Sequence, residues 1–423
     1  MTTSPSPGSV DSSAAYVTYT RTPYLVVSRE KVARKDVYGS IDDYVVRHAQ
    51  LLRGEQDSDT VFVGMHPIGS PGYLPAFSHL ARRGYHVIAC GTRYTQGDAA
   101  LQIENALLDL AACVRDAKER LGYSRVILTG WSGGGALMAG YQAEAESRRI
   151  TKTAAGEETL LATTELIAGD GLVLMAAHRS RHKLITDFLD PSILDEDAPF
   201  DRDIELNIYD ERNPNKAPYT AEFIAHYRAA QRERNRRITA RALDRLEQLR
   251  AAGRSDEESC FVVHGTMADL RWLDNSIDPN DRAAGSSYLG DPRLANDSTA
   301  GLARFNSLRG WLSQWSLDRA QVDAVDGAPR ITVPALVVTA SKDDACPTTH
   351  CRDFFAALAS TQKELHTVEG ANHYFSGPDK QNLLDAAFDH LDQWLVNVDF
   401  ADASRLAGTS LPSGKTSRIV STT

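Results

Sequence analysis

Short apolar segments alternate with amphipathic segments along most of the chain. Six segments are apolar at nearly every position and rich in β-branched residues, which predicts buried strands at residues 60–65, 86–90, 125–129, 172–175, 335–339 and 364–368. A helical periodicity accompanies them at residues 74–83, 99–121, 134–146, 349–359 and 382–395. Strands that are apolar on both sides and connected by helices favour parallel pairing. The pattern therefore predicts an α/β fold with a doubly wound, mostly parallel sheet.

The two ends of the chain have different patterns. Residues 16–28 contain two β-rich runs separated by Thr22-Pro23, which predicts a pair of strands, and residues 41–52 have a helical pattern. Residues 1–15 contain neither the basic start nor the apolar stretch of a secretory signal, so we expect a disordered leader there. Residues 401–423 end in a stretch rich in Ser, Thr and Gly and are expected to form a flexible tail.

The regular alternation is interrupted once, between residues 175 and 335. This interval contains a long charged helical pattern at 219–252, a loop rich in Pro, Asp and Asn at 274–297, and an aromatic helical pattern at 302–318. Because the interval is too long for a loop, we expect an inserted, mainly helical cap domain at 178–328 between two parts of the core, 16–177 and 329–400. Trp272, Trp311 and Trp315 either cover the end of the sheet or form the core of the cap itself.

Composition and charge narrow the choice of partners. With 42% hydrophobic and 24% charged residues among 423, the composition is that of an ordinary globular protein. The formal net charge of −10 disfavours nucleic acid and anionic membrane surfaces as partners. The five cysteines are scattered, as expected in a reducing compartment, and no apolar run approaches the roughly 18 residues of a membrane span. We therefore expect a cytoplasmic protein that acts on a small molecule, in an oligomeric state that the sequence leaves open.

One motif points to chemistry. The predicted strand at 125–129 runs directly into Gly130-Trp131-Ser132-Gly133-Gly134, and a helical pattern follows. This is the G-x-S-x-G motif in a strand–turn–helix setting. A serine in so tight a turn adopts strained backbone angles, and the flanking positions require glycine because a Cβ would collide with the neighbouring strand or helix. The turn exposes the hydroxyl of Ser132, which makes this serine a candidate nucleophile.

Two later segments fit the same picture. The predicted strand at 335–339 is followed by a turn with Asp343 and Asp344 shortly before Pro347, and the strand at 364–368 is followed by a loop with His373. With a nucleophile, an acid and a histidine in this order, the chain resembles the α/β-hydrolase superfamily, as a large, capped, esterase-like serine hydrolase. The resemblance implies the α/β-hydrolase fold and a catalytic triad of Ser132, Asp343 and His373, with Asp344 as the alternative acid.

Each role has a chemical reason. A serine hydroxyl becomes a useful nucleophile when an imidazole removes its proton, and a carboxylate fixes the tautomer of that imidazole and stabilises its cation. The oxyanion that forms needs backbone donors. One donor should be the N–H of Gly133, directly after the nucleophile. The other should come from the loop after residues 60–65, whose place matches the oxyanion loop of the superfamily; since Pro67 has no N–H, Ile68 is the candidate and Gly69 the alternative.

Other polar residues were weighed for binding roles. Three residues next to the predicted strand ends are candidate substrate contacts: His66, Trp131 and His178. His178 is equally well explained as a structural histidine. The cluster of Cys346, His350 and Cys351 suggests zinc, but a structural zinc site needs four ligands and no fourth is nearby. The glycine-rich turn also lacks the patterns of nucleotide-binding loops, so neither a metal nor a cofactor is expected.

These observations predict a cofactor-free serine hydrolase that cleaves a carboxylic ester, thioester or lactone of a small to medium organic substrate through an acyl-serine intermediate. An alternative that uses the same triad is hydrolysis of a C–C bond in a β-diketone or a ring-fission product. A third hypothesis is a ligand-binding member of the superfamily without catalytic activity. The sequence does not identify the substrate.

Overall fold

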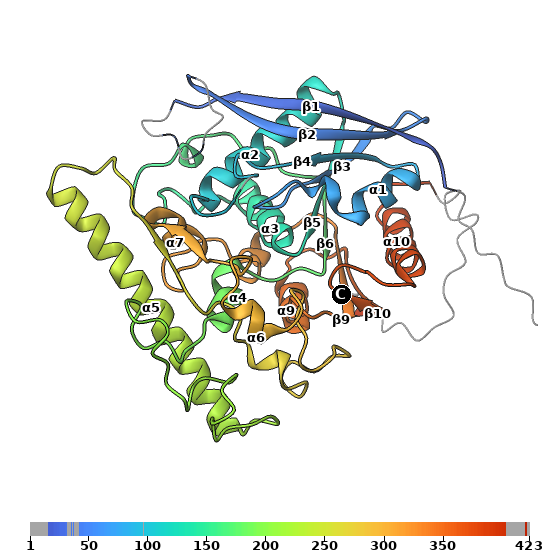
Figure 1. Cartoon of the computed structure of the whole chain (residues 1–423). Coiled ribbons are helices and arrows are strands. Elements are labelled where there is room, and N and C mark those ends of the chain that lie inside the picture. The colour runs from blue at the N-terminus through green and yellow to red at the C-terminus, as the bar shows by residue number, and fades with distance from the viewer. Residues whose placement is uncertain are drawn as a thin grey trace, which may run out of the picture.

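The computed structural model describes residues 16–31, 35, 37, 42–95, 97–402 and 419–420. These residues contain a nine-stranded sheet in the order β1-β2-β4-β3-β5-β6-β9-β10-β11 (Figure 1). Its strands are β1 (Tyr19–Arg29), β2 (Tyr44–Gly54), β3 (Thr60–Gly64), β4 (His86–Cys90), β5 (Arg125–Trp131), β6 (Gly171–Met175), β9 (Ala335–Lys342), β10 (Lys363–Asn372) and β11 (Ile419–Val420). The leader predicted at 1–15, and residues 403–418 and 421–423 of the predicted tail, lie outside the described residues.

The six central strands are all parallel. They run in the order β4-β3-β5-β6-β9-β10, while β1, β2 and β11 pair antiparallel at the two edges. This arrangement confirms the doubly wound, mostly parallel sheet, and each of the six predicted strands corresponds to one of the central strands. β9 and β10 extend beyond their predicted ends to Lys342 and Asn372. Asp343 and His373 therefore follow directly after two neighbouring strands.

Helices cover both faces of the sheet. One face packs against α2 (Ile103–Arg115), α3 (Gly133–Glu146) and α9 (Thr348–Ala357), and the other against α1 (Pro75–Arg82) and α10 (Lys380–Asn397). Short 3₁₀ turns lie at Pro71–Tyr73, Leu160–Ala162, Leu270–Trp272 and Ala328–Arg330, and a π turn at Asp116–Arg120 follows α2. Along β3, Val61 and Val63 pack into the first layer and Phe62 into the second. Both faces of the strand are buried, which is why it is apolar at every position.

The N-terminal predictions are wrong in two places. Residues 16–28 do not form a strand pair, because β1 continues through Pro23 as a single edge strand, where a residue without an N–H is tolerated. The helical pattern at 41–52 is also wrong, because β2 covers this region and pairs with β1 and β4. Its alternate residues are buried, but one of them is Arg47, which ion-pairs with Glu30 and Asp109. A charged residue at a core position hid the two-residue period of the strand.

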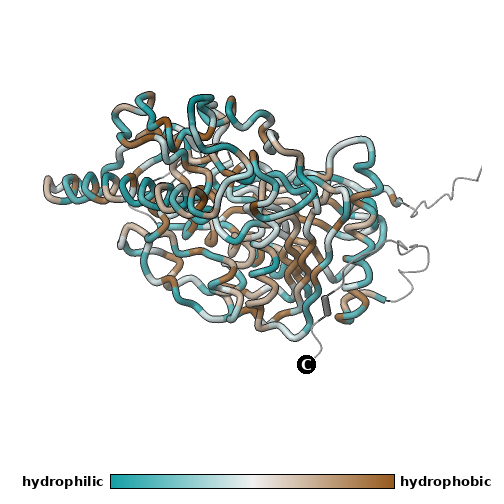
Figure 2. Tube along the Cα trace, turned by 90° about the horizontal axis from the view of Figure 1, so that it is seen from below, coloured by the Kyte–Doolittle hydropathy of each residue, from teal (hydrophilic) through white to brown (hydrophobic). Residues whose placement is uncertain are grey.

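A long segment leaves the sheet after β6 and returns at β9, its parallel neighbour. It contains α4 (Arg181–Phe188), α5 (Ala221–Ala251), β7 (Cys260–Val262), α6 (Pro292–Asn296), β8 (Phe305–Ser307), α7 (Leu308–Gln314) and α8 (Ala324–Gly327). The helix predicted at 302–318 is shorter than expected, because β8 precedes α7. Figure 1 shows α5 running along one side of the molecule, and Figure 2 shows the same helix at the edge, largely hydrophilic, while hydrophobic segments gather inside.

The three tryptophans of this segment form part of its own core. Trp272, Trp311 and Trp315 are fully buried in a cluster that also includes Phe188 of α4 and Ile238 of α5. This cluster is separate from the two layers that cover the sheet. Of the two alternatives for these tryptophans, the structure supports the one in which they form the core of the inserted segment. Over the part of the chain that the structure describes, no helix combines the length and the apolarity needed to cross a bilayer.

Candidate active site

Ser132 occupies the sharp turn between β5 and α3. Its backbone angles are φ 54° and ψ −123°, a strained conformation for a residue with a side chain. The glycines around it have no room for a Cβ: one added to Gly130 would lie 2.5 Å from the carbonyl oxygen of Gly134, and one added to Gly134 would lie 2.6 Å from that of Met65. The steric reason for glycine at these positions is thus as the sequence predicts.

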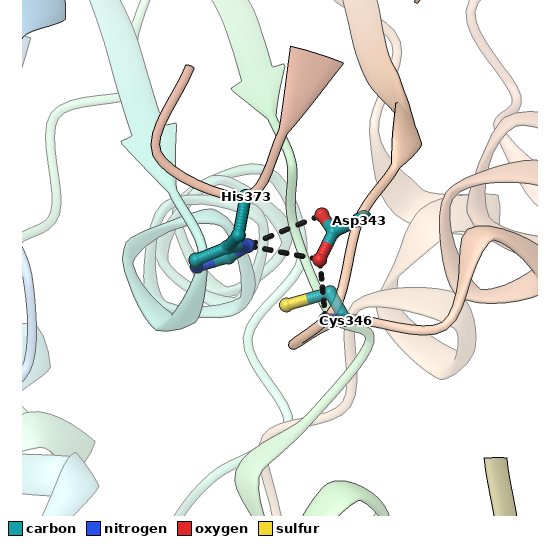
Figure 3. A group of neighbouring side chains, drawn as sticks. All are labelled: Asp343, Cys346 and His373. Atoms are coloured by element: carbon teal, nitrogen blue, oxygen red, sulfur yellow. Dashed lines mark hydrogen bonds and ion pairs between the residues drawn. The ribbon is translucent and has the colours of Figure 1, made fainter. Parts of the chain in front are cut away.

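Asp343 and His373 meet across the ends of β9 and β10. The His373 Nδ1 atom lies 3.1 Å from both carboxylate oxygens of Asp343, and both side chains are buried (Figure 3). The Oδ1 atom of Asp343 also accepts the backbone N–H groups of Ala345 and Cys346, at 2.9 and 2.7 Å. Asp344 instead faces the backbone N–H of His373. Of the two aspartates, Asp343 is the one that contacts the imidazole.

The histidine loop is held beside the serine turn. The indole N–H of Trp131 donates to the carbonyl of His373 at 3.1 Å, and the Trp131 ring packs edge-on against Phe375. Ser132 and His373 line one cavity of about 200 Å³. Among the hydrogen bonds of the described residues, none joins the Ser132 hydroxyl to the His373 ring. The structure thus brings the three predicted triad residues to one place, without a hydrogen bond between the serine and the histidine among the described residues.

Cys346 lies beside both of these residues. Its Sγ atom is 3.8 Å from Ser132 Oγ, and its thiol contributes to the electrostatics of the His373 ring (Figure 3). The sequence analysis considered this cysteine only as a zinc ligand and missed its place at the site. The available signal was its position three residues after Asp343, within a turn that must fold back around the carboxylate.

The surroundings of His373 favour the protonated form of its imidazole ring. Burial lowers the pKa of the imidazole, but the charge of Asp343, the nearby Cys346 thiol and hydrogen bonds to both raise it, and the net pKa lies well above its ordinary value. Burial also raises the pKa of the Cys346 thiol, so that the thiol stays protonated at neutral pH. The fraction of His373 that can act as a base therefore increases with pH.

The loop after β3 is organised by His66. The Nδ1 atom of His66 lies 2.7 Å from the carbonyl oxygen of Ile68 and 3.3 Å from its N–H. A neutral ring nitrogen either donates or accepts, and burial lowers the pKa of His66 to about 4, so the ring is neutral at pH 7. The shorter contact makes Nδ1 the donor to the carbonyl, which leaves the N–H of Ile68 for another acceptor. The N–H of Gly133, as the first residue of α3, has no partner within its helix.

The three candidate substrate contacts, His66, Trp131 and His178, all line the cavity. Two of them converge near Gly133: the Nε2 atoms of His66 and His178 lie 3.1 and 3.2 Å from the point that a Cβ on Gly133 would occupy. A third nitrogen, Nη1 of Arg181, lies 3.7 Å from the same point. The sequence analysis missed Arg181, although it follows His178 by three residues in the segment that leaves β6.

One group of three potential metal ligands occurs among the described residues, and it is Asp343, Cys346 and His373. The carboxylate already faces His373 Nδ1 with both oxygens and accepts two backbone N–H groups, so these side chains are satisfied without an ion. The zinc cluster considered from the sequence does not form, since the Cys351 thiol donates to the carbonyl of Ala177 at 3.2 Å. A larger cavity of about 580 Å³ lies against α5, and none of the predicted site residues lines it.

Comparison with known proteins agrees with this geometry. The model of the family Hydrolase_4, described as serine aminopeptidase S33, matches residues 313–377, which include Asp343 and His373. The chain is similar to this family over that stretch, which is less than half of its length. A hydrolase activity is the coarse function that this similarity supports. A sequence comparison with curated proteins finds no match.

Several solved structures are similar to the chain. The α/β hydrolase GrgF from Penicillium sp. sh18 has 12% identity and a TM-score of 0.48, with 91% of this chain and 100% of that chain covered. DcsB, in complex with its substrate analogue, has 13% identity and a TM-score of 0.47, with coverage of 90% and 99%. Est1E from Butyrivibrio proteoclasticus has 11% identity and a TM-score of 0.42, with coverage of 83% and 96%. Similarity at this level does not extend to substrate or mechanism.

Proposed function

We propose that the protein is a cofactor-free serine hydrolase that cleaves a carboxylic ester, thioester or lactone through an acyl-serine intermediate. The observation that carries the proposal is the buried pair of Asp343 and His373 in one cavity with Ser132, which sits at the strained turn before α3. A serine next to such a pair has both an acceptor for its proton and a carboxylate that stabilises the resulting imidazolium.

In the proposed reaction, His373 removes the proton of Ser132 as Oγ bonds to the carbonyl carbon. The imidazolium then gives this proton to the departing alcohol or thiol as the acyl-serine forms. Water, activated by the same imidazole, releases the acid and restores the serine. The hydroxyl and the ring need to approach each other for the first step, and catalytic hydrogen bonds often tighten only when substrate binds.

The N–H groups of Gly133 and Ile68 are the proposed oxyanion donors. Gly133 offers an N–H at the positive end of α3, and the contact of His66 with the Ile68 carbonyl leaves the N–H of Ile68 unused. Gly69 is the alternative if the loop shifts when substrate binds.

We also propose that residues 178–328 act as a cap that limits the size of the substrate. Six lining residues come from this segment: His178, Arg181, Leu184, Phe188, Tyr288 and Leu302. The volume of about 200 Å³ is below the roughly 300–1,000 Å³ of sites for drug-sized ligands. A small substrate with an apolar part fits this space better than a polymer.

Labelling with a fluorophosphonate and turnover of a panel of p-nitrophenyl and thiol esters test the proposal. The wild-type protein should be labelled at Ser132 and should hydrolyse at least one short-chain ester, whereas Ser132→Ala should lose both properties. Ser147→Ala, at the exposed far end of α3, is the matched control and should retain them. Ester turnover that survives Ser132→Ala would overturn the assignment. Cleavage of a β-diketone in the absence of any ester turnover would replace it with C–C bond hydrolysis.

A further inference from the structure

Ionisable groups are unevenly distributed around the cavity that Ser132 lines. The lining residues include one arginine and three histidines, and none of them is Asp or Glu. The basic residues are Arg181, His66, His178 and His373. Of these, His373 is paired with Asp343 and Arg181 with Asp98, two carboxylates outside the cavity lining. His66, His178 and Arg181 lie around Gly133, the residue that follows Ser132.

Arg181 presents a buried positive charge to this space. Its side chain is only 6% exposed, its Nη2 atom donates to Asp98 at 3.0 Å, and its guanidinium stacks 4.1 Å from the centroid of the Trp315 ring. Within the described part of the chain, its Nε atom has no hydrogen-bond partner. Burial lowers the pKa of Arg181 to about 10, so the group remains charged at neutral pH. A buried cation with unused donors is costly unless a ligand completes its hydrogen bonds.

His178 supplies a second set of unused polar atoms. The residue is 4% exposed, and over the described residues its Nδ1 atom has no partner. Its Nε2 atom and Nη1 of Arg181 lie 3.2 and 3.7 Å from one point beside Gly133. Burial first, and then neighbouring basic groups including Arg181, lower the pKa of His178 well below its ordinary value. These distances place the two nitrogens side by side next to Gly133, and an anion in the cavity in front of them would offset the effect of the neighbouring basic groups and accept hydrogen bonds from both side chains.

We propose that the cavity selects substrates that carry a carboxylate near the bond to be cleaved, and that Arg181 and His178 bind this carboxylate. The inference rests on the proposed function and specifies its substrate class. A guanidinium offers parallel N–H donors that match the two oxygens of a carboxylate. The single fixed charge and the small volume fit a monoanionic group on a short acyl chain better than a phosphate ester. Both side chains reach the space beside Gly133, the residue after Ser132. The bound carboxylate would therefore be separated by only a few bonds of the substrate from the carbonyl that Ser132 attacks.

A pair of esters matched in size provides the kinetic test. The p-nitrophenyl hemiester of glutaric acid carries a carboxylate, and its methyl-capped analogue does not. We expect the wild-type protein to prefer the hemiester at least 10-fold in kcat/KM. Arg181→Met should reduce this preference to less than about twofold, mainly through KM, whereas Arg181→Lys should reduce it less because the charge remains. An equal rate on both esters, or a preference that persists in Arg181→Met, would overturn the proposal.

Arg179→Met is the matched control. Arg179 lies two residues away, pairs with Asp323 outside the cavity lining and is 21% exposed, so its removal should leave the preference unchanged. If the preference fell equally in Arg179→Met, the effect of Arg181→Met would be a general effect on the fold rather than loss of a carboxylate contact. Thermal unfolding of both variants shows whether each remains folded.

A binding measurement on the wild-type protein separates this inference from the proposed function. Calorimetry should show that glutarate binds at least 10-fold more tightly than glutaramide, whether or not any ester is turned over. Glutarate should also slow fluorophosphonate labelling of Ser132 at a concentration at which glutaramide does not. Equal binding of the acid and the amide would refute carboxylate recognition while leaving serine hydrolase activity intact. Absence of labelling and of all ester turnover would refute the hydrolase assignment instead.

Discussion

Replacing Asp343 by asparagine perturbs the proposed triad with little change of shape. Since Oδ1 of Asp343 accepts the backbone N–H groups of Ala345 and Cys346, an asparagine must keep its carbonyl oxygen there. Its NH₂ group then takes the place of Oδ2, 3.1 Å from His373 Nδ1. An NH₂ group only donates, so it favours the tautomer of His373 with an unprotonated Nδ1. In that tautomer Nε2 already carries a proton, and the ring can no longer accept the proton of Ser132 at this atom.

The size of the loss follows from the same distance. At 3.1 Å and an effective dielectric constant of about 20, a full negative charge stabilises an imidazolium by about 5 kcal/mol. This energy corresponds to roughly four orders of magnitude in rate. At a pH above the pKa of His373 the resting ring is neutral, and the imidazolium forms only when the ring takes the proton of Ser132, so under these conditions the loss belongs to the transition state. We therefore expect Asp343→Asn to lower kcat and kcat/KM together, by about 10³-fold to 10⁴-fold.

The assay is release of p-nitrophenol from the best ester of the panel, with burst kinetics to isolate acylation. Asp344→Asn is the matched variant, because among the described residues the His373 ring is hydrogen-bonded to the carboxylate of Asp343 and not to that of Asp344. We expect Asp344→Asn to retain activity to within about tenfold. Thermal unfolding of both variants checks that the fold is intact.

Two results would refute this reasoning. One is a loss smaller than tenfold in Asp343→Asn, which would mean that the carboxylate does not act through the imidazole. The other is a larger loss in Asp344→Asn than in Asp343→Asn, which would make Asp344 the acid of the site.

Three further predictions follow from the structure. Because the pKa of His373 is raised well above its ordinary value, the fraction of unprotonated His373, and with it kcat/KM, should increase with pH through an apparent pKa above 6.5. The measurement is kcat/KM from pH 5 to 10, and a midpoint at or below 6.5 would contradict the electrostatics of the site. Gly130→Ala places a Cβ 2.5 Å from a backbone oxygen and should lower the free energy of unfolding in urea by about 3 kcal/mol or more, whereas Gly97→Ala, with nothing within 4 Å, should change it by less than about 0.5 kcal/mol. Asp109→Asn removes one of the two carboxylates that pair with the fully buried guanidinium of Arg47 and should cost about 3–5 kcal/mol of stability in the same assay. Asp318→Asn, in an ion pair whose side chains are half exposed, should cost less than about 1 kcal/mol. Similar losses would show that burial does not decide the strength of these pairs.

The sequence predicts the core of the fold well where local pattern and burial agree. A central parallel strand is covered on both faces, so its residues are uniformly apolar and stand out from the helices around them. The prediction failed at β2, where a core position is taken by Arg47. An arginine is tolerated there because Glu30 and Asp109, from other elements, supply opposite charges. Pairing between residues distant in sequence is invisible to a local pattern.

The sequence by itself determined the sheet, the serine turn and the order in which a candidate acid and histidine follow their strands. These features depend on neighbouring residues: a run of apolar side chains, a turn that accepts only glycine, a polar residue where a strand ends. Only the tertiary structure decided that Asp343 rather than Asp344 faces the imidazole, that Cys346 lies beside both Ser132 and His373, and that Arg181 faces the cavity. The physical reason is that distances across a site are set by the packing of β5, β6, β9 and β10 into one sheet, which brings together side chains from four separate segments of the chain.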